Sequence, residues 1–158
     1  MNRQYSLLRD PGHFLSLGGG AGFAPKGPGT AGTLVGIGVY WSMAALPQAT
    51  YLFIVLVMFL AGIWLCERTA AAMGKHDHPS IVWDEIVGYL LTMAFVSPGI
   101  AACVFGFIAF RIFDIFKPWP IGLLDRRVQG GVGIMLDDVL AAIFAAIVLE
   151  FIEYLSYI

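Results

Sequence analysis

Long apolar runs alternate with short polar segments along the whole chain, and this pattern limits the fold more than any other feature. The runs cover residues 34–46, 49–66, 86–110 and 134–158. They are continuous, rich in Ala, Leu, Met and Phe, and lack the alternation and regular turns of β-strands. Hydrophobic residues make up 59% of the chain and charged residues only 13%, which is typical of a protein embedded in a bilayer. The sequence therefore predicts an all-α integral membrane bundle built from short helices and hairpins.

The length of 158 residues predicts a single domain, residues 1–158, that begins with a polar segment at 1–17. The first twelve residues lack the basic start, apolar centre and cleavage site of a secretory signal. The net charge is -2 and no basic tract stands apart from acids, which argues against a nucleic-acid partner. Cys66 and Cys103 have no metal-binding spacing, so we expect both to be small core residues.

Prolines interrupt the apolar runs and leave the number of membrane crossings open. Pro47 separates the first two runs, and Pro98 splits residues 86–110. Since a span needs about 20 apolar residues, residues 86–110 form either one kinked span or a hairpin that returns at Pro98. Every Lys and Arg falls in one of three polar segments. The positive-inside rule therefore favours hairpins at both prolines, with all polar segments on one cytoplasmic face.

Acidic residues gather at the ends of the apolar runs. Asp84 and Glu85 precede the third run, Asp114 follows it, and Asp137 and Asp138 lie near the start of the last run. Helix capping could explain Asp84 and Asp137, but Asp114 ends a helix, where a negative charge is disfavoured. Clustered oxygen ligands with few histidines or thiols suit a hard cation, Mg²⁺ before Zn²⁺.

Residues 111–127 crowd two carboxylates and four cations around a Pro-Trp-Pro turn. Isolated charges next to hydrocarbon are costly, so a cluster of both signs indicates mutual pairing or a shared ligand. Arg111, Asp114 and Lys117 share one helix face, which would also fit an ordinary ladder of salt bridges. Pro118 biases Lys117 out of the helix.

The turn that follows Lys117 leads to three charged residues at 125–127. A fixed turn that presents Lys117 and returns to this group fits an anion held beside a metal. For Trp119 we favour a simpler role, because tryptophan is common as an anchor at the membrane interface.

Two further segments carry weaker signals. Residues 18–33 are rich in glycine and lead into a helix, so their N–H groups could bind an anion. The segment lacks the Gly-Lys-Ser/Thr of a P-loop, and a flexible linker is the plainer alternative. In His76-Asp77-His78, three consecutive residues rarely chelate one ion, so we expect a loop before a helix. Asp77 or His78 could still lie in the outer surroundings of a metal.

Four motifs occur in a fixed order from about Gly18 onward. They are Pro25-Lys-Gly-Pro-Gly-Thr-Ala-Gly-Thr-Leu34, His76-Asp-His-Pro-Ser-Ile-Val-Trp-Asp-Glu85, Arg111-x-x-Asp-x-x-Lys-Pro-Trp-Pro120, and Asp125-Arg126 through Gly130-Gly-x-Gly-Ile-Met-x-Asp-Asp138. In this combination the chain resembles the phosphatidylglycerophosphatase A family. Thr33 stands where many members have Ser, a change that keeps a hydroxyl group, and Lys26 falls at a variable position.

The resemblance implies an Mg²⁺-dependent enzyme of the bacterial inner membrane, with several membrane passes and its site facing the cytoplasm. It would remove the terminal phosphate of phosphatidylglycerophosphate, the last step in making phosphatidylglycerol. On this basis we hypothesise three groups of site residues. Metal ligands are Asp84, Glu85, Asp114 and Asp138; phosphate-binding residues are Lys117, Arg126, Arg111, Gly29 and Thr30; catalytic residues are Asp125, Asp137 and Lys117.

Alternatives stay open at this point. Asp125 or Asp137 could be the general base for an attacking water, or an aspartate could attack and form an acyl-phosphate. A non-catalytic membrane protein that binds anionic lipid through Lys117, Arg126 and Arg127 is the second class. A divalent-cation transporter is disfavoured, because it would place acids at the midplane of the spans. The sequence does not predict an oligomeric state.

Overall fold

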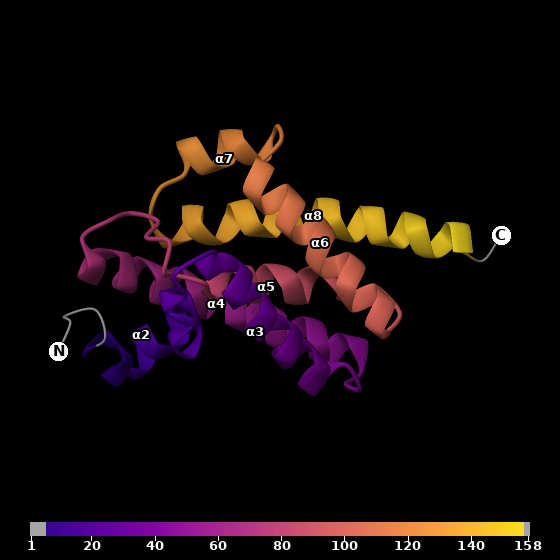
Figure 1. Ribbon diagram of the computed structural model, residues 1–158, viewed down its shortest axis with the longest axis horizontal. Coiled ribbons are helices and arrows are strands. Elements are labelled where there is room, and N and C mark those ends of the chain that lie inside the picture. The colour runs from indigo at the N-terminus through magenta and orange to yellow at the C-terminus, as the bar shows by residue number, and fades with distance from the viewer. Residues whose placement is uncertain (1–5, 157–158) are drawn as a thin grey trace.

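The computed structural model describes residues 6–156, and every regular element in that range is a helix (Figure 1). The elements are η1 (Leu7–Arg9), α2 (Pro11–Ser16), η2 (Gly18–Phe23), α3 (Pro28–Met43), α4 (Gln48–Met73), α5 (Trp83–Thr92), α6 (Ile100–Phe116), α7 (Ile121–Arg127) and α8 (Gly130–Ser156). The all-α prediction is confirmed. Residues 1–5 of the expected polar segment and residues 157–158 of the last apolar run lie outside the described part.

Both proline interruptions are turns between helices. Pro47 is the N-cap of α4 and separates it from α3. Pro98 lies between α5 and α6, whose N-cap is Gly99. Proline has no backbone N–H to donate within a helix, and it disfavours helical geometry in the residue before it. Each helix is therefore interrupted by the local properties of its proline. Residues 86–110 are therefore a hairpin and not one kinked span.

Two helices, α4 and α8, are long and apolar enough to cross a membrane. The outer side of α4 carries large exposed apolar side chains, among them Phe53, Leu56, Leu60 and Trp64. An exposed apolar surface of this size is costly in water and suits a hydrocarbon surrounding. The structure agrees with a membrane-embedded helical bundle.

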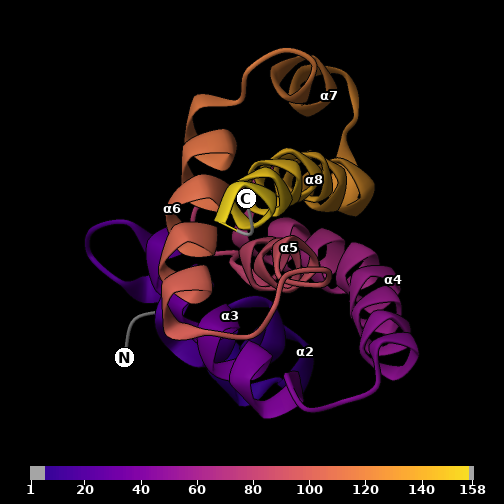
Figure 2. The same cartoon turned by 90° about the vertical axis from the view of Figure 1, so that its right-hand side faces the viewer.

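The short helix α5 forms the centre of the bundle, with α3, α4, α6 and α8 around it (Figure 2). Close packing depends on Gly88, where a Cβ atom would lie 2.6 Å from the ring of Phe110. The rings of Tyr40 and Tyr89 pack edge to face beside this contact. Cys66 and Cys103 are both buried, as expected for core residues. Since α5 is enclosed on its sides, its two ends are where polar groups can be reached.

Helices α3, α5 and α8 begin at the same end of the bundle, and α6 finishes there, as the left side of Figure 1 shows. The hairpin turns at Pro47 and Pro98 lie toward the other end. This arrangement follows from the antiparallel return at each proline. It brings the charged residues of α5, α6 and α8 together beside the glycine-rich start of α3, and the convergence of these segments agrees with the prediction from the sequence.

Candidate active site

A cavity of about 280 Å³ opens where these four helix ends meet. It is bounded by the start of α3, the loop before α5, the start of α5, the end of α6 and the third turn of α8. The charged residues that line it are Asp77, Asp84, Glu85, Arg111, Asp114, Lys117, Asp137 and Asp138. All four predicted metal ligands are in this set.

Helix capping does not account for the acidic residues of α5 and α8. The N-cap of α5 is Val82, and no side chain caps that helix. Asp137 and Asp138 lie in the third turn of α8, beyond the N–H groups that a cap would satisfy. Asp84 and Glu85, in the first turn of α5, gain from the positive end of the helix dipole. The carboxylates are thus available to something other than the backbone.

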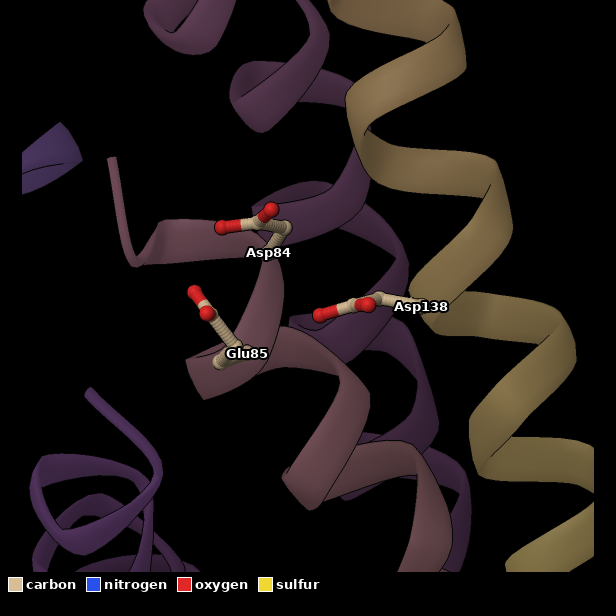
Figure 3. A group of neighbouring side chains, drawn as sticks. All are labelled: Asp84, Glu85 and Asp138. Atoms are coloured by element: carbon tan, nitrogen blue, oxygen red, sulfur yellow. The ribbon is translucent and has the colours of Figure 1, made fainter. Parts of the chain in front are cut away.

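Three carboxylates converge in the cavity: Asp84, Glu85 and Asp138 come from two helices and point into one space (Figure 3). Their potential ligand atoms all lie within 4.8 Å of one another. One oxygen of each is buried and has no hydrogen-bond partner. Because an unpaired buried carboxylate is very costly, this group fits a cation. A donor set made only of oxygen suits Mg²⁺.

Burial also changes the acidity of the two carboxyl groups at the start of α5. It raises the pKa of Asp84 well above the usual range, and the neighbouring Glu85 adds to this effect. Burial raises the pKa of Glu85 to about 8, with a further contribution from Asp138. A cation among these groups would favour their charged forms and reverse the shifts.

Arg111 and Asp114 form an ion pair in the last turns of α6, where a lone carboxylate would oppose the helix dipole. The guanidinium Nη1 also lies 3.6 Å from Oε1 of Glu85. Both side chains are largely buried, and Nε of Arg111 has no partner. Arg111 therefore links the end of α6 to the carboxylate group while one of its donors stays free for a ligand.

Lys117 does not continue the salt-bridge ladder of α6, because it ends the helix with a left-handed backbone (φ 41°). Its Nζ donates to Oδ1 of Asp125 at 2.7 Å and to Oδ2 of Asp137. Burial disfavours the ammonium group, but the hydrogen bonds to Asp125 and Asp137 outweigh it and raise the pKa of Lys117. Lys117 is therefore a fixed positive charge at the wall of the cavity.

Gly29 lies in the first turn of α3 and touches the site directly. A Cβ atom there would collide with Oε1 of Glu85 and would lie 3.0 Å from Nη1 of Arg111. Only glycine lets α3 approach so closely. Thr30 is half-buried and does not line the cavity, whereas Thr33 donates a hydrogen bond to the carbonyl oxygen of Gly29 at 2.9 Å.

The structure separates the remaining predicted residues from the cavity wall. Arg126 and Arg127 are exposed on α7 and do not line the cavity. Asp125 reaches it only through Lys117. Trp119 is 81% exposed, which agrees with an anchoring role. The roles of Thr30, Asp125 and Arg126 stay predictions.

Asp77 is the site residue that sequence reasoning undervalued. It lines the cavity from the loop before α5 and holds a left-handed backbone (φ 47°), which is uncommon outside glycine. His78 instead accepts a hydrogen bond from the N–H of Ser80 at its Nδ1, 3.2 Å away. The available signal was an acidic residue shortly before the Asp84-Glu85 pair.

Comparison with known proteins assigns the chain to a family. Residues 14–153 match the family described as Phosphatidylglycerophosphatase A. The chain belongs to the phosphatidylglycerophosphatase A family. It is 44% identical over 148 residues to "Phosphatidylglycerophosphatase A" of Escherichia coli, covering 93% of this chain and 86% of that protein. It is also 44% identical over 155 residues to the protein of that name in Haemophilus influenzae, covering 96% of this chain and 94% of the relative.

A further relative carries a different name. A protein of Bacteroides thetaiotaomicron with the provisional name phosphatidylinositol-3-phosphatase is 36% identical over 148 residues, covering 85% of this chain and 89% of the relative. No solved structure matches the chain. Membership of the phosphatidylglycerophosphatase A family confirms the resemblance seen in the four motifs, and it makes the chain a phosphatase.

Proposed function

We propose that the protein is an Mg²⁺-dependent phosphatase that converts phosphatidylglycerophosphate to phosphatidylglycerol and inorganic phosphate. We further propose that it acts in a bacterial inner membrane with its cavity facing the cytoplasm. The names of the two relatives at 44% identity support the substrate. The observation that carries the chemistry is the convergence of Asp84, Glu85 and Asp138, with unpartnered buried oxygens, beside Arg111 and Lys117.

The proposed metal ligands are Asp84, Glu85 and Asp138, with Asp114 beside them at the end of α6. When bound, Mg²⁺ would polarise phosphoryl oxygens and lower the pKa of a water molecule. The protein's part is to hold the carboxylates together before the ion arrives. The start of α5 and the neighbouring turn of α8 do this, because the two helices pack against each other and against the rest of the bundle.

Arg111 and Lys117 are the proposed partners of the phosphate oxygens. Arg111 keeps an unpartnered Nε, and Lys117 is held in place by two carboxylates. Fixed cations of this kind stabilise the charge that develops on the phosphoryl group in the transition state. The N–H groups in the first turn of α3, next to Gly29, could add hydrogen bonds to the phosphate. Arg126, on α7, would act farther out, on arriving substrate.

Asp125 and Asp137 are the proposed candidates for the general base, since both already hold Lys117 near the cavity. The competing route is attack by an aspartate and formation of an acyl-phosphate. Rapid-quench experiments with ³²P-labelled substrate distinguish the two routes. A labelled, base-labile protein adduct would rule out direct attack by water.

The surroundings of the cavity suit a lipid substrate. Ile115 lines the cavity and is 61% exposed, and Phe116 and Trp119 beside it are more exposed still. Apolar side chains next to a charged site allow the acyl chains to stay in the bilayer while the headgroup enters. The concentration of Lys and Arg in segments at this end supports the cytoplasmic orientation.

The test is phosphate release from phosphatidylglycerophosphate in detergent micelles, with Mg²⁺ or with excess EDTA, for the wild type and Asp114→Asn. We expect release that needs Mg²⁺ and is lost in the variant. No release from folded protein under any condition would overturn the proposed activity and return weight to the lipid-binding alternative. Phosphatidylinositol 3-phosphate belongs in the same assay, because one relative bears that provisional name.

A further inference from the structure

The charges around the cavity do not balance with one divalent cation. Six carboxylates and two cations line it, so with all eight groups ionised the formal excess is four negative charges. One Mg²⁺ among Asp84, Glu85 and Asp138 would leave half of that excess. A phosphate monoester, which itself brings up to two negative charges, would then enter a negative site.

A second group of carboxylates lies beside the first. Asp77 and Asp137 both line the cavity that Asp84, Glu85 and Asp138 line. Asp137 comes from α8 and Asp77 from the loop before α5, so the two are brought together only by the fold. Neither belongs to the group of three whose ligand atoms lie within 4.8 Å.

One carboxylate oxygen of Asp137 can bind a ligand. Asp137 is only 5% exposed, and its Oδ2 accepts a hydrogen bond from Nζ of Lys117. Its other oxygen, Oδ1, is buried and has no partner. An orphaned carboxylate oxygen at the wall of a charged cavity indicates a ligand that the protein itself does not supply.

On these grounds, and resting on the proposed metal-dependent phosphatase, we propose that the cavity holds a second divalent cation. Its ligands are Asp137 and Asp77, next to the first ion at Asp84, Glu85 and Asp138. Two Mg²⁺ ions balance the formal excess of negative charge and let the phosphate headgroup bind. Pairs of ions that hold both the attacking and the leaving oxygen are common in enzymes of phosphoryl transfer.

A second ion also separates the roles of the two carboxylates that hold Lys117. Asp137 becomes a ligand, whereas Asp125, which is exposed and does not line the cavity, holds Lys117 in place. The loop that carries Asp77 becomes part of the site. The left-handed backbone of Asp77 is then explained, because this conformation places the Asp77 carboxylate at the cavity.

The experiment counts ions without using substrate. Metal-free protein in detergent is titrated with Mn²⁺, and bound ions are counted by electron paramagnetic resonance of the free ion. We expect two ions per chain in the wild type, with dipolar broadening of the bound signal. Asp77→Asn should bind one ion and lose the broadening. Its position on an exposed loop keeps the risk of unfolding low, so it carries the test even if Asp137→Asn fails to fold.

Glu150→Gln is the matched control, because it removes one carboxylate of the same α8 helix far from the cavity; it should keep two ions. A wild type that binds one ion, with the remaining charge neutralised by protons, would overturn the proposal. Two ions in both wild type and Asp77→Asn would overturn the assignment of Asp77. Phosphate release by protein with one bound ion would leave the proposed function intact and refute this inference alone.

Discussion

The two ends of the bundle each contain a cavity of similar size, yet they differ completely in charge. The cavity at the shared start of α3, α5 and α8 measures about 280 Å³ and has eight charged residues in its wall. The one near the Pro47 and Pro98 turns measures about 230 Å³, and no Lys, Arg, Asp or Glu lines it. Volume alone would not separate them. The chemistry of the wall does.

The two ends also differ in their buried polar atoms that have no hydrogen-bond partner. At the far end the buried hydroxyl of Tyr40 has no partner, and Tyr51 donates to the carbonyl oxygen of Leu90 at 2.7 Å. An unpaired hydroxyl costs roughly 1–3 kcal/mol, which a folded protein can tolerate. Several unpaired carboxylates cost far more. Buried groups without a partner therefore favour the binding of a ligand at the charged end far more than at the other end.

The largest expected effect comes from removing a carboxylate of the charged end. Asp84→Asn takes away one of the three proposed metal ligands and should lower phosphate release from phosphatidylglycerophosphate by at least about 100-fold, because the proposed activation of water by the metal would be lost. Excess Mg²⁺ should restore only part of the rate. Glu150→Gln should keep wild-type activity; equal losses in both variants would mean that the two ends do not differ in function.

Arg111→Gln tests the positive side of the same cavity. It leaves Glu85 and Asp114 without their cation and removes a proposed phosphate partner. We expect kcat/KM to fall by about 10²–10³-fold, the usual cost of losing a group that stabilises transition-state charge. Steady-state kinetics in mixed micelles measure this, with circular dichroism to verify the helix content. A change in KM alone would show that Arg111 only helps the substrate to bind.

A smaller effect is expected from a pair of glycines on one helix. Gly29→Ala would push a Cβ atom into Glu85 and Arg111, whereas Gly38→Ala meets nothing within 4 Å. The first should reduce activity by about 10-fold or more, because misplacement of catalytic groups is costly. The second should leave activity unchanged and raise the free energy of unfolding by roughly 0.5–1 kcal/mol. Equal activities would contradict the close approach of α3 to the site.

The smallest effect belongs to the far end. Tyr40→Phe removes a buried hydroxyl without a partner while keeping the edge-to-face ring contacts with Tyr51 and Tyr89. Activity should not change, and the free energy of unfolding should stay the same or rise by up to about 1 kcal/mol. Thermal unfolding in detergent measures this. A clear loss of stability would mean that the hydroxyl has a partner at the far end after all.

The helices and most of the cavity wall could be predicted from the sequence, because both follow from local rules. Apolar length and proline positions determined the hairpins, and hairpins bring charged helix ends such as Asp84 and Asp114 together. The position of Asp77 could not be predicted, because it depends on how an irregular loop folds over the start of α5. Arg126 shows the opposite error. Its position in the sequence predicted a place near Lys117 at the site, but in α7 the side chain is exposed and does not line the cavity.

Both cysteines of the chain are buried, Cys66 in α4 and Cys103 in α6. The wild-type protein should therefore react slowly with maleimides that cannot cross a membrane. A single cysteine introduced at Arg127, at the end of α7, or at Leu155, near the C-terminal end of α8, would then be labelled with almost no background from the native cysteines. In intact cells and in inverted vesicles the two labels should respond in opposite ways. Because the tightly packed core shields both native cysteines, labelling of an introduced cysteine can show which side of the bilayer the charged end faces.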